Sequence, residues 1–237
     1  MRWDRRFASP DSKRAYVRSL FSTIANRYDL ITVLLSFGQD RRWKRRLAAL
    51  APDHAGACIL DLACGTGDIA YQVASRGAHV IGLDITVRML ELAQRKRCRA
   101  ERHVHFVAGD MMALPFPAGR FECVTTGYGL RNVPVLADAL AEIVRVLAPG
   151  GLLISLDFNR PAQPFLRSIY LGYLWLVGSV LGAVLHRDPD TYRYIPESIR
   201  RYPGAAGVCD LARAAGFASC DHLPVLGGLM AIHVAKK

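Results

Sequence analysis

The chain has 237 residues, with 31 Lys and Arg against 20 Asp and Glu, and a formal net charge of +11. Hydrophobic residues make up 51% of it, which excludes a disordered chain because there is ample apolar material for a core. The 20 glycines follow no three-residue period, which excludes collagen. The positive charge is informative about binding partners rather than about the fold. Nucleic acid, an anionic membrane surface and an acidic ligand are all candidate partners.

The cysteines and the N-terminus indicate the cellular compartment. The six cysteines form no C-x-x-C pair, which argues against a zinc knuckle or a redox pair, and no cluster of metal ligands is visible. The first residues contain no apolar stretch of the kind found in signal peptides. We therefore expect a cytoplasmic protein with buried, reduced thiols and no metal.

Hydrophobic periodicity predicts a helical cap followed by an alternation of strands and helices. Residues 12–50 are expected to be helical and to stop at Pro52. Further helices are expected at 68–76, 86–97, 135–147 and 203–217, and strands at 58–63, 79–84, 103–110, 120–127, 152–158, 218–225 and 229–236. Alternating strands and helices imply a parallel, doubly wound sheet. The last two strands read as a hairpin, which brings in one antiparallel strand.

The expected fold is therefore α/β, with a doubly wound, mostly parallel seven-stranded sheet in a single domain. We divide the domain into an N-terminal helical cap, a cofactor-binding core, an apolar helical insertion over the substrate, and a closing helix with a strand pair. These segments cover residues 1–52, 57–158, 160–202 and 203–237.

One segment is unusual for an α/β protein. Residues 168–185 contain no charge over eighteen positions, at the lower limit for a membrane span. They also contain Gly178-x-x-x-Gly182, a helix-packing pattern. Three interpretations stay open: a core helix or lid over an apolar ligand, a helix that lies in a membrane interface, and a true span.

The strongest motif is LDLACGTGD at 60–68, where a strand runs into a glycine loop and a helix. Gly65 and Gly67 allow a tight turn and close approach of a ligand. Asp61 lies within the strand before the loop, where a carboxylate suits a cationic ligand better than the pyrophosphate of a dinucleotide. Asp84 and Asp110 end the next two strands and can bind a ribose and an exocyclic amine. S-adenosylmethionine, which carries a sulfonium, an ammonium and no phosphate, fits this pattern.

Together LDLACGTGD, LDIT and GDM resemble the first three motifs of class I S-adenosylmethionine-dependent methyltransferases. The flanking strings narrow the resemblance to the ubiquinone/menaquinone biosynthesis C-methyltransferase family, over about residues 21–237. These strings are FSTIANRYDLITVLLSFGQDRRWKR, ALPFPAGRFECVTTGYGLRNV and DPDTYRYIPESIRRYP. The resemblance implies methylation of a ring carbon of a polyprenylated quinol, most directly demethylmenaquinol to menaquinol. A different small apolar acceptor and an RNA methyltransferase are the alternatives.

The resemblance also implies cofactor contacts for Thr66 and Asp84, and for Asp110 and Met111 along the adenine. Gly127 lies at a further cofactor position, where Ser is common in the family. The full expected cofactor set is Asp61, Gly65, Thr66, Gly67, Asp84, Ile85, Asp110, Met111 and Gly127.

Four polar residues are the candidates for the chemistry. Arg131 and Asn132 follow the fourth strand, where Arg131 can stabilise a phenolate or orient a water but cannot act as the base. Tyr28 and Asp29 are the candidates in the helical cap. Naphthoquinol and benzoquinol head groups are not distinguished, and neither is the general base.

The expected partners follow from the charge pattern and the substrate. Two basic clusters, at 41–46 and 95–99, are either solvated helix faces or contacts to anionic lipid. We expect peripheral contact with the inner face of the membrane and no nucleic acid, and a homodimer is left open.

Overall fold

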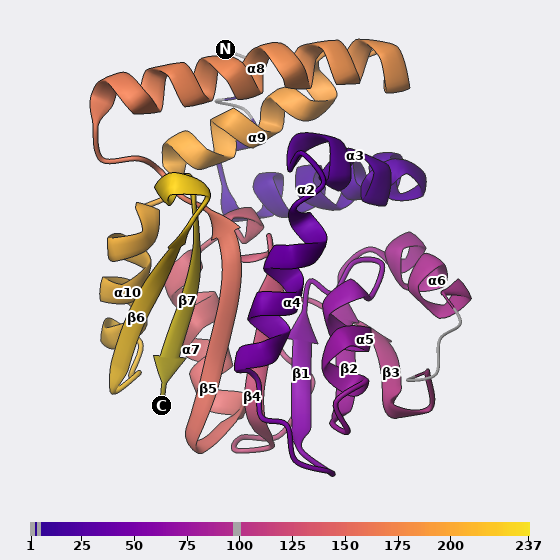
Figure 1. Ribbon diagram of the computed structural model, residues 1–237, viewed down its shortest axis with the longest axis vertical. Coiled ribbons are helices and arrows are strands. Elements are labelled where there is room, and N and C mark those ends of the chain that lie inside the picture. The colour runs from indigo at the N-terminus through magenta and orange to yellow at the C-terminus, as the bar shows by residue number, and fades with distance from the viewer. Residues whose placement is uncertain (1–2, 4–5, 97–100) are drawn as a thin grey trace.

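The computed structural model describes Trp3, residues 6–96 and residues 101–237 (Figure 1). Part of the second basic cluster, at 97–99, lies outside the described residues. The strands are β1 (Cys58–Leu62), β2 (His79–Asp84), β3 (Val104–Ala108), β4 (Phe121–Gly127), β5 (Leu147–Phe158), β6 (Ser219–Val225) and β7 (Met230–Lys236).

The seven strands form one sheet in the order β3-β2-β1-β4-β5-β7-β6. The first five pair in parallel, and β7 lies antiparallel between β5 and β6. This confirms the predicted mostly parallel sheet with one antiparallel strand. The parallel strands are apolar along most of their length because helices cover both faces of the sheet.

The helices form two layers on the sheet. On one face lie α4 (Asp40–Leu50) and α5 (Asp68–Ala74), which share a core with β1, β4 and β5. On the other face lie α7 (Leu136–Val146) and α10 (Gly204–Ala214). α6 (Val87–Arg95) follows β2 and contacts β3. α5, α6, α7 and α10 begin within a few residues of the predicted boundaries, whereas the predicted helical range 12–50 is divided into α2, α3 and α4.

Four helices lie beyond the carboxyl ends of the parallel strands, as Figure 1 shows. They are α2 (Pro10–Ile24), α3 (Tyr28–Leu35), α8 (Pro164–His186) and α9 (Asp190–Arg201). We call α3, α8 and α9 the roof. Short 3-10 turns at Ala25–Arg27, Glu101–His103, Leu130–Asn132 and Leu226–Gly228 complete the chain. Because ligands bind at the carboxyl ends of strands in open α/β sheets, the roof and α2 lie where a ligand would be enclosed.

The uncharged segment at 168–185 lies within α8, the outermost helix of the roof (Figure 1). Its glycine pair packs α8 onto α9: a Cβ at Gly178 would come within 3.0 Å of Tyr192 O, and one at Gly182 within 2.5 Å of Asp188 O. Among the described residues, α8 is the one helix long and apolar enough to cross a membrane. It is packed here on one side as a lid, and its other side is exposed.

The expectation that all cysteines are free thiols is wrong for one pair. Cys209 in α10 and Cys220 in β6 form a disulfide, with their Cα atoms 5.1 Å apart. The two residues are eleven apart in sequence, and α10 packs directly against β6. Spacing alone did not indicate this pairing, because the contact depends on how the helix returns to the sheet. Cys58, Cys64 and Cys123 are free.

Candidate functional site

Two main cavities lie side by side beneath the roof and α2. The larger, about 410 Å³, is lined mainly by apolar and aromatic side chains from α2, α3, α8, α9 and the end of β5; we call it the apolar cavity. The smaller, about 80 Å³, lies over the ends of β1, β2, β3 and β4; we call it the cofactor cavity. A third space of about 20 Å³ adjoins the glycine loop and α4, and we call it the loop cavity.

Asp84 at the end of β2 is held by the backbone around it. It accepts hydrogen bonds from Gly65 N at 2.9 Å and from Thr86 N at 2.8 Å. Burial raises the pKa of the Asp84 carboxyl, and these two N–H groups oppose that shift. Each carboxylate oxygen can still accept from a ribose hydroxyl, because a carboxylate offers about four acceptor sites.

Asp61 is buried within β1 and only partly satisfied. Its Oδ1 accepts from the Thr125 hydroxyl at 2.8 Å, whereas its Oδ2 is buried and has no hydrogen-bond partner. Burial raises its pKa to about 7. Buried acceptors without a partner are rare. Asp61 itself lines none of the three cavities, so a cationic group bound in them would act on this oxygen through water or through its charge.

The far end of the cofactor cavity is lined by Ile85, Asp110 and Met111, three residues of the expected cofactor set. Asp110 accepts from Met112 N at 2.9 Å, and its Oδ2 lies 2.8 Å from Arg14 Nε in α2. The first turns of α2 therefore close the cavity over the end of β3, a contact between segments almost 100 residues apart.

Gly127 lines both the cofactor cavity and the loop cavity. A Cβ placed there would come within 2.6 Å of Ile69 Cδ1. The side chain of Ile69 thus occupies the volume that a Ser would need, which gives a physical reason for the departure from the residue common in the family.

Thr66 and Gly67 lie in the glycine loop but take different parts in it. The hydroxyl of Thr66 lines the loop cavity and donates to Asp29 Oδ1 at 2.6 Å. Gly67 has φ +81, and a Cβ there would come within 3.0 Å of the Phe106 and Tyr71 rings. Gly67 therefore serves the turn and helix packing, while Thr66 faces the space where a ligand would bind.

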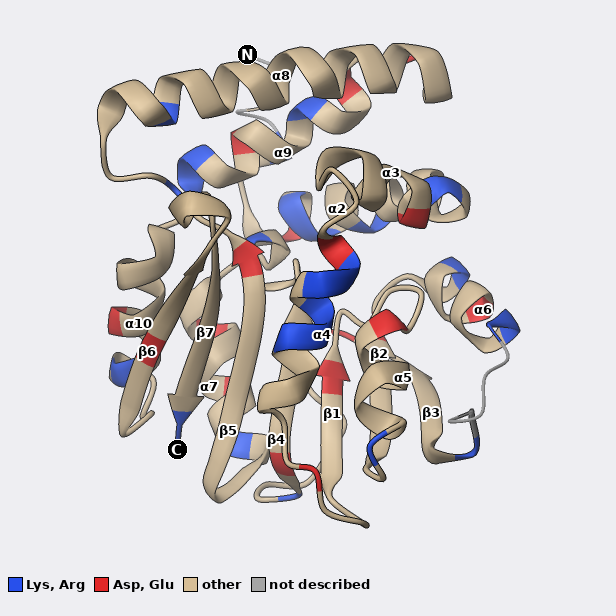
Figure 2. Cartoon of the chain, in the orientation of Figure 1, with Lys and Arg blue, Asp and Glu red and all other residues tan. Residues whose placement is uncertain are grey.

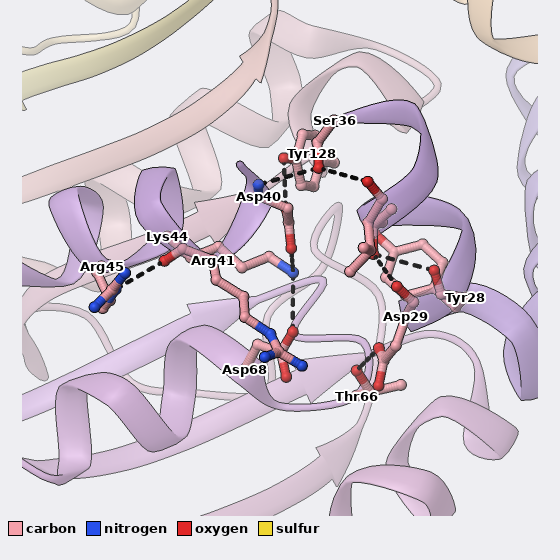
Figure 3. A network of polar contacts seen from close by, with 12 residues as sticks. Tyr28, Asp29, Ser36, Asp40, Arg41, Lys44, Arg45, Thr66, Asp68 and Tyr128 are labelled. Atoms are coloured by element: carbon pink, nitrogen blue, oxygen red, sulfur yellow. Dashed lines mark hydrogen bonds and ion pairs between the residues drawn. The ribbon is translucent and has the colours of Figure 1, made fainter. Parts of the chain in front are cut away.

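A chain of polar contacts runs from the cavities to the surface through α4 (Figure 3). Tyr128 Oη donates to Asp40 Oδ1 at 2.6 Å, and Lys44 Nζ lies 2.7 Å from Asp40 Oδ2 and 3.0 Å from Asp68 Oδ2. Tyr128, Asp40 and Lys44 are buried, whereas the side chain of Asp68 is 30% exposed. Burial disfavours a charged Lys44, but Asp68, Tyr28 and Asp40 outweigh it and raise the Lys44 pKa above its ordinary value.

Asp29 belongs to the outer part of the same network. Its Oδ2 lies 2.6 Å from Lys96 Nζ, which also pairs with Asp68 Oδ1 at 2.8 Å. Asp29 lines a surface depression next to Lys96 rather than the apolar cavity. Lys96, which the sequence grouped with a solvated basic cluster, is instead a partner of the glycine loop through Thr66.

Arg131 and Asn132 form a short 3-10 turn after β4 and are both buried. Arg131 lines the apolar cavity, with Nε 3.3 Å from Asp157 Oδ1 and its guanidinium over the Phe158 ring. Asn132 lines the cofactor cavity, and its Oδ1 accepts from Arg131 Nη1 and from Tyr194 Oη. The pair thus lies between the two cavities, and most of the Arg131 charge is balanced by Asp157.

Two tyrosines mark the point where the cavities meet. Among the described residues, Tyr28 and Tyr128 are the two that line the apolar, cofactor and loop cavities together. Burial raises the pKa of Tyr28 to about 12 and raises that of Tyr128 well above its ordinary value, so both phenols are neutral at neutral pH. A group transferred from one cavity to the other would pass between these rings.

Sequence reasoning found Tyr28 but missed Tyr128, Asp40 and Lys44. Lys44 was read as one member of a basic run, yet its neighbours Arg45 and Arg46 are exposed and it is buried. The available signal was an Asp and a Lys four residues apart on the face that carries Trp43 and Leu47.

Comparison with known sequences places the chain in a family. The ubiE/COQ5 methyltransferase family matches residues 9–237. Demethylmenaquinone methyltransferase of Thermus thermophilus is 42% identical over 92% of this chain and 100% of its own. The ubiquinone/menaquinone biosynthesis C-methyltransferase of Methylobacterium nodulans is 41% identical over 96% of this chain and 92% of its own. The enzyme of the same name from Francisella tularensis is 36% identical over 96% of this chain and 93% of its own.

Solved structures share the fold at low identity. A methyltransferase of Thermotoga maritima, dependent on S-adenosylmethionine, has a TM-score of 0.66 at 20% identity, covering 93% of this chain and 99% of its own. Phosphoethanolamine N-methyltransferase 2 of Haemonchus contortus, in complex with S-adenosyl-L-methionine, has a TM-score of 0.57 at 16% identity, covering 81% and 51%.

The residues present fit this cofactor. The unpaired Asp61 Oδ2 suits its cationic end, and Asp84, which lines the cofactor cavity, suits its ribose. Within the described residues no group of His, Cys, Asp and Glu could hold a metal ion. The chain belongs to the ubiE/COQ5 methyltransferase family, and it is a methyltransferase that uses S-adenosylmethionine.

Proposed function

We propose that the protein methylates a ring carbon of a polyprenylated quinol, with demethylmenaquinol as the primary substrate. The observation that carries this is the pairing of the cofactor cavity, which carries Asp84 and Asp110, with a larger apolar cavity; the two meet at Tyr28 and Tyr128. A ring placed at the junction would leave its prenyl tail in the apolar cavity. The names of the curated relatives support the same substrate class.

S-adenosylmethionine, when bound, supplies a methyl group on a positively charged sulfur. We propose that Asp61, Gly65, Thr66, Gly67, Asp84, Ile85, Asp110, Met111 and Gly127 hold it, as the sequence predicted. Arg131 then stabilises the ionised ring oxygen, Asn132 fixes Arg131, and Tyr28 closes the reaction space against water. Asp29 acts indirectly, because it positions the hydroxyl of Thr66.

A direct assay tests this function. The purified protein is incubated with labelled S-adenosylmethionine and, in parallel, with chemically reduced demethylmenaquinone, a demethylated benzoquinol and total RNA. Label in the naphthoquinol is the expected result, and label in both quinols would widen the head-group range. Label in RNA alone, or in neither quinol, would overturn the proposal.

We further propose peripheral contact with the cytoplasmic face of the membrane through the outer side of α8. Large apolar side chains are exposed along it, and Figure 2 shows almost no charge on its outer course. They are Phe165, Leu166, Ile169, Tyr173, Trp175, Leu176, Val180 and Val184. Leu166, Ile169 and Tyr173 also line the apolar cavity, together with the exposed Phe37 and Leu226, so the cavity opens at this apolar surface. A water-insoluble tail would thus pass between bilayer and cavity without crossing water.

Vesicle flotation tests the contact. Leu176→Ser/Val180→Ser should weaken flotation with anionic vesicles, whereas Leu50→Ser, an exposed apolar change at the far end of α4, should not. Equal flotation of all three proteins would contradict the proposal. A mass that doubles in solution and returns to the monomer in Leu176→Ser/Val180→Ser, without vesicle binding, would assign the surface to a homodimer instead.

A further inference from the structure

The methylation of a phenolic ring requires a proton acceptor, and neither Arg131 nor neutral Tyr28 supplies one. Arg131 stays protonated at any ordinary pH and is already paired with Asp157. The Tyr28 hydroxyl has no hydrogen-bond partner among the described residues. Tyr128 differs, because its hydroxyl donates to a buried carboxylate, Asp40, while its ring borders all three cavities.

We propose that Tyr128 and Asp40 are the proton-accepting pair of the enzyme, and that Lys44 and Asp68 hold Asp40 in position. This rests on the proposed function, since it needs a ring hydroxyl in the apolar cavity. Figure 3 shows the continuous path from the Tyr128 hydroxyl through Asp40 and Lys44 to Asp68. Each link is between 2.6 and 3.0 Å, within hydrogen-bond distance.

The proton and electron count closes along this path. The ring hydroxyl gives its proton to Tyr128 Oη as the Tyr128 proton passes to Asp40 Oδ1. The electron pair left on the ring oxygen is delocalised to the ring carbon, which bonds to the methyl carbon as the carbon–sulfur bond breaks. The carbon then loses its hydrogen as a proton, which returns the ring oxygen to a hydroxyl. One proton per turnover therefore remains, on Asp40, and it passes to solvent when the product leaves, which restores the contact between Asp40 and the protonated Lys44.

The local charges keep the pair in the right state before the reaction. Lys44 Nζ lies 2.7 Å from Asp40 Oδ2, and burial raises the pKa of Tyr128, which keeps it a neutral phenol that can donate and accept at once. The charged and titratable groups around the pair come from five elements: Tyr28 in α3, Lys44 in α4, Asp68 in α5, Arg131 after β4 and Asp157 in β5.

The backbone at Tyr128 has an unusual conformation that fixes the direction of its side chain. Tyr128 has φ +61, a left-handed conformation that is costly for a bulky residue, and its N–H donates to Leu156 O at 2.7 Å. Such strain at the carboxyl end of a central strand is common at functional sites. It directs the phenol across the cavity junction to α4.

The test measures kcat against pH for the wild type and for Tyr128→Phe, with chemically reduced, short-chain demethylmenaquinone. Tyr128→Phe leaves the Asp40–Lys44 pair in place, so the fold is retained, and a melting curve with S-adenosylhomocysteine checks this. We expect kcat to fall by about 100-fold at neutral pH, the range for a lost general base. The loss should shrink toward pH ~10, where phenols ionise without help.

Matched variants exclude a merely structural role. Tyr202→Phe removes a buried phenol outside the three cavities, whose hydroxyl has no partner, and should leave kcat and its pH profile unchanged. Asp40→Asn should reproduce the pH-dependent loss where it folds. A loss in Tyr128→Phe that is the same at every pH, or a pH-dependent loss found in Tyr28→Phe instead, would overturn the assignment. If the wild type methylates no quinol, the proposed function fails with it, whereas an active wild type with an unaffected Tyr128→Phe rejects the proton path alone.

Discussion

The floor and the roof of the site differ in what holds them. The floor, formed by the ends of β1, β2 and β4 with α4, contains the buried Asp40–Lys44 ion pair, which Asp68 extends, and a hydrogen bond from Thr125 to the buried Asp61. The roof is held by apolar contacts and by close helix packing at Gly178 and Gly182, and α8 exposes its other side. The floor therefore positions the reacting groups through short polar contacts. The roof instead supplies the apolar volume of the cavity and an exposed apolar surface beside it.

The largest effect should follow from breaking the floor. Lys44→Met leaves Asp40 and Asp68 without their shared buried cation, and loss of one partner from a buried pair costs about 3–5 kcal/mol. Arg45→Met is the control, because Arg45 is exposed one position away and should change stability by less than about 0.5 kcal/mol. Urea unfolding of both variants measures the difference, and equal stabilities would remove the distinction between floor and surface.

Substitutions at two glycines of α8 should change stability by smaller amounts, and the two changes should have opposite signs. Gly182→Ala would bring a Cβ within 2.5 Å of Asp188 O and should destabilise by about 1–3 kcal/mol. Gly172→Ala in the same helix meets nothing within 4 Å and should stabilise by about 0.5–1 kcal/mol. Thermal melting tests the pair, and the same sign at both positions would show that α8 is not packed as described.

The smallest effect concerns the pH dependence of the floor. Asp61 has its pKa raised to about 7 by burial, above its unfolded value, so its contribution to stability is present at low pH and is lost as the pH rises through 7. Cofactor binding has the opposite dependence, because a cationic group favours the carboxylate. Affinity for S-adenosylmethionine should rise about tenfold between pH 6 and 8. Calorimetry measures it, and Asp61→Asn should flatten the curve; a rising curve in Asp61→Asn would assign it to another group.

The sequence predicted the sheet well and the floor in part, for a physical reason. Strand–helix alternation and the glycine loop are local patterns, so the positions of Asp61, Asp84 and Asp110 at strand ends could be read directly. Tyr128, Asp40 and Lys44 come together only when α4 packs on the end of β4, a contact across 88 residues between Tyr128 and Asp40. The Cys209–Cys220 disulfide was missed because it depends on the return of α10 to the sheet edge. The exposed side of α8 could not be predicted either, because composition does not distinguish a buried apolar helix from one at the surface.

The position of β7 has a consequence for synthesis on the ribosome. This strand, at residues 230–236, inserts between β5 and β6, so both of its neighbours emerge from the ribosome before it does. Until then β5 presents an unpaired edge next to the cavity-forming end of the sheet, and such edges template wrong pairings. The sheet of the nascent chain therefore closes only when residues 230–236 have been made, and the edge of β5 stays unpaired until that point.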